Sequence, residues 1–145
     1  MDKNLTARAT IAIDAPADKV WQALVNPEAI KEYMFGTNVV SDWREGSAIS
    51  WRGEFQGKKY EDKGVLLCVA PREKLQYSHF SPLSGRPDEP ENYHTVTIEL
   101  SGHNSRTDVS LEQDKNPNEE ARSDSEKNWA TMLAGLKKYL EHPRA

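Results

Sequence analysis

The first pattern along the chain is an alternation of apolar and mostly polar side chains over residues 5–13. A period of two is typical of a strand with one buried face. Pro16 then suits the first turn of a helix, where its missing N–H has no intrahelical partner, and Asp14 is placed to cap that turn. Asn26-Pro27 ends this helix and begins a second short one over residues 28–33. The inward face of the first helix is expected to carry Val20, Trp21, Leu24 and Val25.

The middle of the chain predicts six further strands separated by glycine and proline. Residues 93–101 and 107–113 alternate most clearly and are joined by a short turn, so they form a hairpin. If residues 73–80 pair directly with 93–101, a register of Tyr77 with Val96 places His79 opposite His94. The predicted strands span residues 37–43, 47–52, 59–69, 73–80, 93–101 and 107–113.

Two polar segments interrupt the pattern. Residues 81–92 contain three prolines and a glycine and form a long loop, a length often found in functional lids. Residues 114–124 are expected to lead into the final helix, which Pro143 ends. An amphipathic helix after six strands buries its stripe against the concave face of a curved antiparallel sheet, an α+β arrangement. That stripe is Trp129, Met132, Leu133, Leu136 and Leu140.

Composition narrows the class of protein. A length of 145 residues suits one domain spanning residues 1–145. The net charge of -4 and scattered basic residues argue against a nucleic-acid partner. No apolar run approaches the roughly 20 residues that span a bilayer, and the first residues lack the apolar segment of a signal peptide. With Cys68 as the single cysteine, we expect a cytoplasmic protein.

The order of several short motifs resembles the START-like (SRPBCC) proteins, most closely the family named for homologues of the activator of the 90-kDa heat-shock-protein ATPase. The resemblance implies a helix-grip (START/Bet v-like) fold in β-α-α-β6-α order, with the long C-terminal helix across the concave face and a cavity between them. Tyr33-Met34-Phe35 departs from many relatives, whose second helix ends in tryptophan. The motifs are Ala15-Pro16, Val20 to Leu24, Asn26-Pro27-Glu28, Gly64 to Pro71 and the helix around Trp129.

The aromatic residues are open to two interpretations, because a filled core and a ligand pocket both use large apolar side chains. Trp21 is interpreted as core. Trp51, Tyr77 and Trp129 lie on apolar faces of central elements and are the strongest lining candidates. The full set of predicted cavity-lining residues is Phe35, Trp51, Tyr60, Tyr77, His79, His94, Val96, Trp129, Met132 and Leu133.

Candidate chemistry is sparse. His79 and His94 are expected at the pocket mouth, where two imidazoles suit proton transfer or half a metal site. A zinc site needs a third protein ligand, for which Asp88 or Glu91 is nearest, and we expect neither a metal nor a cofactor. Asp62 shares parity with Tyr60 and points inward if no bulge intervenes, where a buried carboxyl suits an acid or base.

Three functions remain open from the sequence. The first is binding of a small apolar or aromatic, lipid-like ligand, which the resemblance supports. The second is a protein-interaction module related to the chaperone ATPase activators, acting in a regulatory or stress pathway. The third is a cyclase or hydrolase that uses His79, His94 or Asp62, although no nucleophile motif such as Gly-x-Ser-x-Gly occurs. No catalytic residue is assigned, and the pattern does not predict the oligomeric state.

Overall fold

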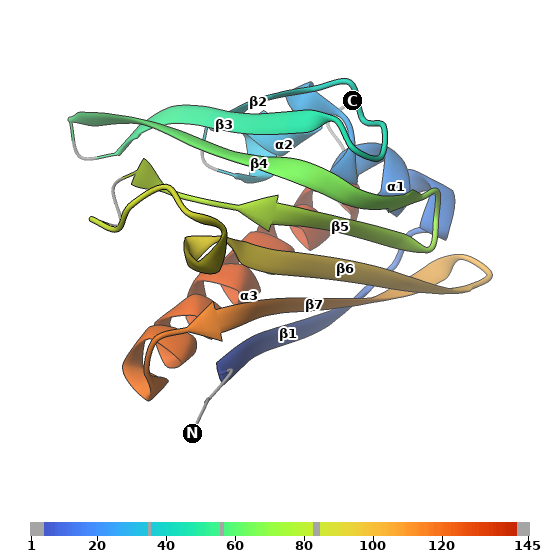
Figure 1. Cartoon of the computed structure of the whole chain (residues 1–145). Coiled ribbons are helices and arrows are strands. Elements are labelled where there is room, and N and C mark those ends of the chain that lie inside the picture. The colour runs from blue at the N-terminus through green and yellow to red at the C-terminus, as the bar shows by residue number, and fades with distance from the viewer. Residues whose placement is uncertain (1–4, 35, 56, 83–84, 142–145) are drawn as a thin grey trace.

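The computed structural model describes residues 5–34, 36–55, 57–82 and 85–141. Within these, seven strands form one antiparallel sheet in the order β1-β7-β6-β5-β4-β3-β2 (Figure 1). The long helix α3 lies behind this sheet, as do the short helices α1 and α2, which lie toward its β2 side. The predicted α+β helix-grip order is therefore confirmed. The elements are β1 (Leu5–Ile13), α1 (Ala17–Leu24), α2 (Pro27–Tyr33), β2 (Asn38–Ser41), β3 (Ala48–Phe55), β4 (Lys58–Ala70), β5 (Lys74–His79), η2 (Pro90–Asn92), β6 (His94–His103), β7 (Arg106–Asn116) and α3 (Glu119–Glu141).

The helix α3 packs most extensively against the edge strand β1. The side chains that β1 turns toward the helix include Ala7 and Ala9, both buried and both small enough to let the helix backbone approach. The helix contributes Met132, Leu133 and Leu136 to the same hydrophobic core. The helix α3 is therefore packed closely against the β1 edge of the sheet.

Side chains of α3 also hydrogen-bond the free edge of β1. The backbone N–H of Arg8 donates to Glu126 (3.0 Å), Lys137 donates to the carbonyl of Ala12 (2.9 Å), and the N–H of Asp14 donates to Glu141 (2.7 Å). An edge strand with unpaired N–H and C=O groups is a template for pairing with another chain. The helix therefore partners backbone groups that the sheet leaves unpaired.

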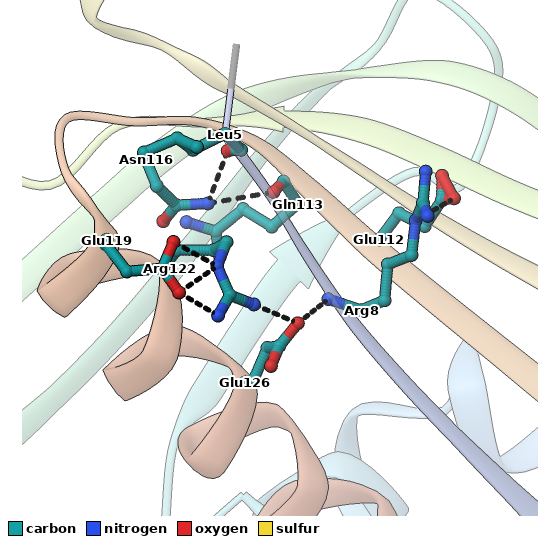
Figure 2. A network of polar contacts seen from close by, with 8 residues as sticks. All are labelled: Leu5, Arg8, Glu112, Gln113, Asn116, Glu119, Arg122 and Glu126. Atoms are coloured by element: carbon teal, nitrogen blue, oxygen red, sulfur yellow. Dashed lines mark hydrogen bonds and ion pairs between the residues drawn. The ribbon is translucent and has the colours of Figure 1, made fainter. Parts of the chain in front are cut away.

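A polar network fixes the first turns of α3 near the start of β1 (Figure 2). Arg122 lies between Glu119 and Glu126, and Glu126 also accepts from Arg8. Attraction to Arg122 and the Arg8 backbone N–H lowers the pKa of Glu126, the backbone bond being the larger cause. The buried side chain of Asn116 donates to the carbonyl of Leu5 (2.9 Å), which ties the end of β7 to β1.

The first helices follow the predicted pattern with one correction. The inner face of α1 buries Val20, Trp21 and Leu24, so the interpretation of Trp21 as core is confirmed. The prediction that Asp14 caps this helix is wrong. The N-cap position is Pro16, two residues after Asp14; its carbonyl accepts from Lys19 and Val20, and no side chain caps the helix.

The predicted polar segment 114–124 is also wrong in its extent. The strand β7 continues to Asn116, and α3 begins at Glu119. The first turns of α3 are polar and ion-paired on their exposed sides, so hydrophobic periodicity gives no helix signal before Trp129. No helix among the described residues is long and apolar enough to cross a membrane.

Candidate ligand-binding face

An aromatic cluster covers the concave face of β3 and β5, away from β1. The ring of Trp51 lies 5.1 Å from that of Tyr77 and 5.0 Å from that of His79, with the His79 ring edge-on. Trp51 and Tyr77 are each 6% exposed. Side chains alternate across a strand, so these residues share the face that β6 lines with Val96. Three of the predicted lining residues therefore meet in one cluster.

Asp62 joins this cluster through His79. Trp51 on β3 pairs with Asp62 on β4 in the sheet register, which places both side chains on the concave face. The Nε2 of His79 lies 2.9 Å from Oδ2 of Asp62. A carboxylate oxygen only accepts hydrogen bonds, so the imidazole N–H is the donor. The inward orientation that sequence parity allowed for Asp62 is the one observed.

The two oxygens of Asp62 differ in their surroundings. Oδ2 accepts from His79, whereas Oδ1 is buried and receives no hydrogen bond from the described part of the chain. The Asp62 side chain is 17% exposed and that of His79 is 27% exposed. The pair therefore lies at the boundary between the aromatic core and solvent.

Gly64 lies where β4 comes very close to β5, beside the contact between Asp62 and His79. A Cβ at Gly64 would lie 1.7 Å from the Ser78 carbonyl oxygen, so only glycine fits there. Next to this position Lys63 and Phe80 exchange two backbone hydrogen bonds of 3.0 and 2.8 Å. The register irregularity of β4 falls later, between Leu66 and Cys68, and leaves the parity of Asp62 intact.

Helix α2 covers part of this face. Tyr33 is buried, donates its hydroxyl to the carbonyl of Ala23 (3.0 Å), and lies where Gly135 lets α3 approach closely. Burial raises the pKa of Tyr33 well above its usual range, and the nearby Tyr77 hydroxyl adds to the rise. Burial likewise raises the pKa of Tyr77. Both phenols therefore stay neutral in a water-poor environment.

The loop before β6 is anchored on the outer face of the sheet, opposite to the polar pair. Lys63 forms an ion pair with Asp88, and Tyr93 donates its hydroxyl to the same carboxylate. The Tyr93 ring stacks on Phe80 at 5.1 Å. These contacts lower the pKa of Asp88, with the Lys63 hydrogen bond as the largest cause. Because Lys63 and Phe80 alternate along their strands with Asp62 and His79, these contacts hold the loop on the outer face of the sheet.

The remaining predicted lining residues have varied positions. His94 lies opposite His79 in the register that the sequence predicted, and its Nδ1 contacts the carbonyl of Asp114 (2.8 Å). The Tyr60 hydroxyl hydrogen-bonds Thr37 (2.8 Å). Trp129 is half-buried and donates its indole N–H to Gln113 on β7 (2.6 Å), away from Trp51. Met132, Leu133 and Val96 are buried in the core cluster, and Phe35 lies outside the described residues.

Sequence reasoning missed the contact between His79 and Asp62. A signal was present, because pairing the predicted strands 47–52 and 59–69 with Trp51 opposite Asp62 would have placed the carboxyl beside the aromatic cluster. The turn between these strands did not fix that register. In the described ranges no three His, Cys, Asp or Glu side chains are grouped to hold a metal ion. Asp88, a candidate third zinc ligand in the sequence, is instead paired with Lys63.

The arrangement supports binding more directly than it supports a reaction. Aromatic rings supply apolar contact area, and an imidazole held by a carboxyl supplies a polar group that orients a ligand. The same pair has the composition of an acid–base pair, but geometry alone does not assign a reaction. A separate hollow of about 670 Å³ lies over β1, β6 and β7, and its lining includes Thr10, Ser101 and Ser110 rather than aromatic residues.

Comparison with known proteins places this chain in a family. The family model described as Activator of Hsp90 ATPase homolog 1-like protein matches residues 14–141. A search of curated proteins gave no match. The solution structure of ChR145 from Cytophaga hutchinsonii is 60% identical, with 97% of each chain covered and a TM-score of 0.86.

Two more distant structures share the fold. The Aha1 dimer from Colwellia psychrerythraea is 20% identical over 97% of this chain and 98% of its own, with a TM-score of 0.73. DynU16, a putative protein of the dynemicin biosynthetic locus, is 19% identical over 98% of this chain and 49% of its own, with a TM-score of 0.79. With the family model covering most of its length, the chain belongs to the Activator of Hsp90 ATPase homolog 1-like family.

Proposed function

We propose that this protein binds one small apolar or aromatic molecule on the concave face of β3–β5, beneath α2 and α3. The observation that carries the proposal is the aromatic cluster of Trp51 and Tyr77 with a polar pair, His79 and Asp62, at its edge. Ligand sites are mostly apolar surfaces with a few convergent polar groups. The family supports the proposal, because START-like proteins, which the sequence resembles, have a cavity between the sheet and the C-terminal helix.

The packing of α3 supports the choice of this half of the sheet. Buried alanines bring the helix close to β1, whereas its described contacts with β3, β4 and β5 are far fewer. On that side the space between helix and sheet is occupied by long side chains, which change rotamer more readily than a backbone moves. A ligand is accommodated there by rearranging Trp51, Met132 and their neighbours.

Native mass spectrometry of the protein purified from its host tests the proposal. We expect an extra mass of one small molecule that is lost on denaturation, and weaker retention by Tyr77→Ala, which removes a ring of the cluster. The matched control Tyr93→Ala removes a ring that stacks on Phe80 on the outer face of the sheet and should keep the ligand. A native mass equal to that of the chain alone, together with no binding of added 2-methylnaphthalene, would contradict the proposal.

A second candidate function is binding of a protein partner, an ATPase chaperone by analogy with the family description. The feature that favours it is three exposed apolar residues on the outer face of the sheet, Val65 and Leu67 on β4 and Val40 on β2, across β3 from them. Neighbouring exposed apolar side chains are a common feature of interaction surfaces. Stimulation of the ATPase of the 90-kDa chaperone by the wild type, and its loss in Val65→Lys/Leu67→Lys, would support this function. No stimulation by the wild type would exclude it.

A further inference from the structure

We propose that Oδ1 of Asp62 is the hydrogen-bond acceptor for the ligand, which is therefore an aromatic or apolar molecule with a hydroxyl or N–H donor. This inference rests on the proposed function and specifies its ligand class. Oδ1 is buried and receives no donor from the described residues, whereas Oδ2 is held by His79 at 2.9 Å. In this proposal Oδ2 accepts from His79 and Oδ1 accepts from the ligand.

The energetic argument starts from the cost of an unpaired acceptor. A buried polar atom without a partner loses its bonds to water and gains nothing in exchange. A donor from outside the chain recovers that loss, and a hydrogen bond to a charged acceptor is stronger than one between neutral groups. A ligand that presents O–H or N–H to Oδ1 is therefore favoured over a ligand of the same shape without it.

The surroundings of Oδ1 define the rest of the ligand. Trp51 lies directly opposite Asp62 in the sheet and touches the His79 ring, so a group that reaches Oδ1 has an aromatic wall beside it. His79 fixes the carboxyl through Oδ2, which limits rotation of the acceptor. A ligand carboxylate would bring a second acceptor toward Oδ1 and is disfavoured.

Access to Oδ1 follows from the position of the pair. The His79 and Asp62 side chains keep 27% and 17% of their surface exposed, so they reach the rim of the cluster. Phe80, Tyr93 and the Lys63–Asp88 ion pair lie on the opposite face of the sheet, so the loop that they anchor does not cover this rim. A ligand entering from the rim meets the polar pair before the buried rings.

Two probes of matched shape test the proposal, 2-naphthol with a hydroxyl donor and 2-methylnaphthalene without one. Isothermal titration of the wild-type protein should show about tenfold tighter binding of 2-naphthol. In Asp62→Leu, an apolar replacement of similar size, the preference should disappear. The matched control is Glu61→Leu, which removes an exposed carboxylate of the neighbouring residue and should keep the preference.

Each outcome decides one point. Equal affinity of the wild type for both probes, or a preference kept by folded Asp62→Leu, overturns this inference and leaves the proposed function standing. Binding of neither probe overturns the proposed function and this inference together. The comparison of the two probes on the wild type needs no substitution, so it decides the question even if Asp62→Leu fails to fold.

Discussion

At the scale of single residues, one glycine and two buried tyrosines shape the site. Gly64 lets β4 approach β5 more closely than a residue with a Cβ would permit, next to the contact between Asp62 and His79. Tyr77 packs on Trp51, Tyr33 lies on α2 against α3, and both stay neutral because burial raises the pKa of each. Strand alternation in the sequence predicted which face of β4 Asp62 occupies. Its contact with His79 could not be predicted, because it depends on how β4 and β5 pair.

Replacing Gly64 with alanine tests the close approach of β4 to β5. The new Cβ would overlap the Ser78 carbonyl oxygen, so β4 and β5 must separate and the free energy of unfolding should fall by about 2–4 kcal/mol. The matched control is Gly102→Ala, whose Cβ would meet the Ala17 methyl at 3.2 Å and should cost less than about 1 kcal/mol. Urea denaturation measures both. Equal stability of Gly64→Ala and wild type would show that β4 and β5 leave room for a side chain at this position.

Alkaline pH should destabilise the protein through the two tyrosines. Their ordinary pKa is 10.0, and in the folded state the pKa is raised, so the unfolded chain loses protons first as pH rises. The stability contribution is thus fully present below pH 10.0 and is lost as pH rises toward the raised folded values. We expect a slope of up to about 1.4 kcal/mol per pH unit for each tyrosine.

Urea denaturation at several pH values above 10.0 measures this slope, and Tyr33→Phe and Tyr77→Phe should each make it shallower. The matched control is Tyr139→Phe, which removes a partly exposed hydroxyl that is the smallest cause of the raised Tyr33 pKa, so it should change the slope less than either buried substitution. A slope unaffected by both buried substitutions would mean that other groups govern alkaline unfolding.

At the scale of elements, alternation and turn residues predicted every strand of the sheet, as well as the register of Tyr77 with Val96. They failed at the junction of β7 and α3, where the helix begins at Glu119. The first turns of α3 are held by ion pairs and by contacts with β1 instead of a hydrophobic stripe (Figure 2). Contacts between residues more than 100 positions apart leave no local pattern in the sequence.

Glu126 is the residue that tests the contact between α3 and the free edge of β1. In Glu126→Ala the Arg8 N–H loses its acceptor and Arg122 loses one partner. Hydrogen exchange of the Arg8 amide should then rise by roughly an order of magnitude, and the urea midpoint should fall. Glu126→Gln keeps a side-chain oxygen and should show a smaller change. Unaltered Arg8 exchange in Glu126→Ala would mean that another group protects this edge.

At the scale of the whole molecule, α3 divides the concave face into two halves. The half at β1 is closed by small side chains and helix contacts, and the half at β3–β5 is filled by aromatic rings with a polar pair at the rim. The fold and the aromatic candidates could be predicted from the sequence. The closer packing of α3 against β1 than against β3–β5 could not be predicted, because it depends on where the buried alanines of β1 contact the helix.

Chemical-shift mapping by NMR tests the central claim, binding on the β3–β5 half of the concave face, most directly. The titrant is 2-naphthol and the observed signals are the Trp indole N–H groups and the side-chain methyls. We predict saturable shifts at Trp51 and Leu133, with Val40 and Leu67 on the outer face unchanged. Shifts confined to the outer face, or no saturable shift at Trp51, would contradict the account.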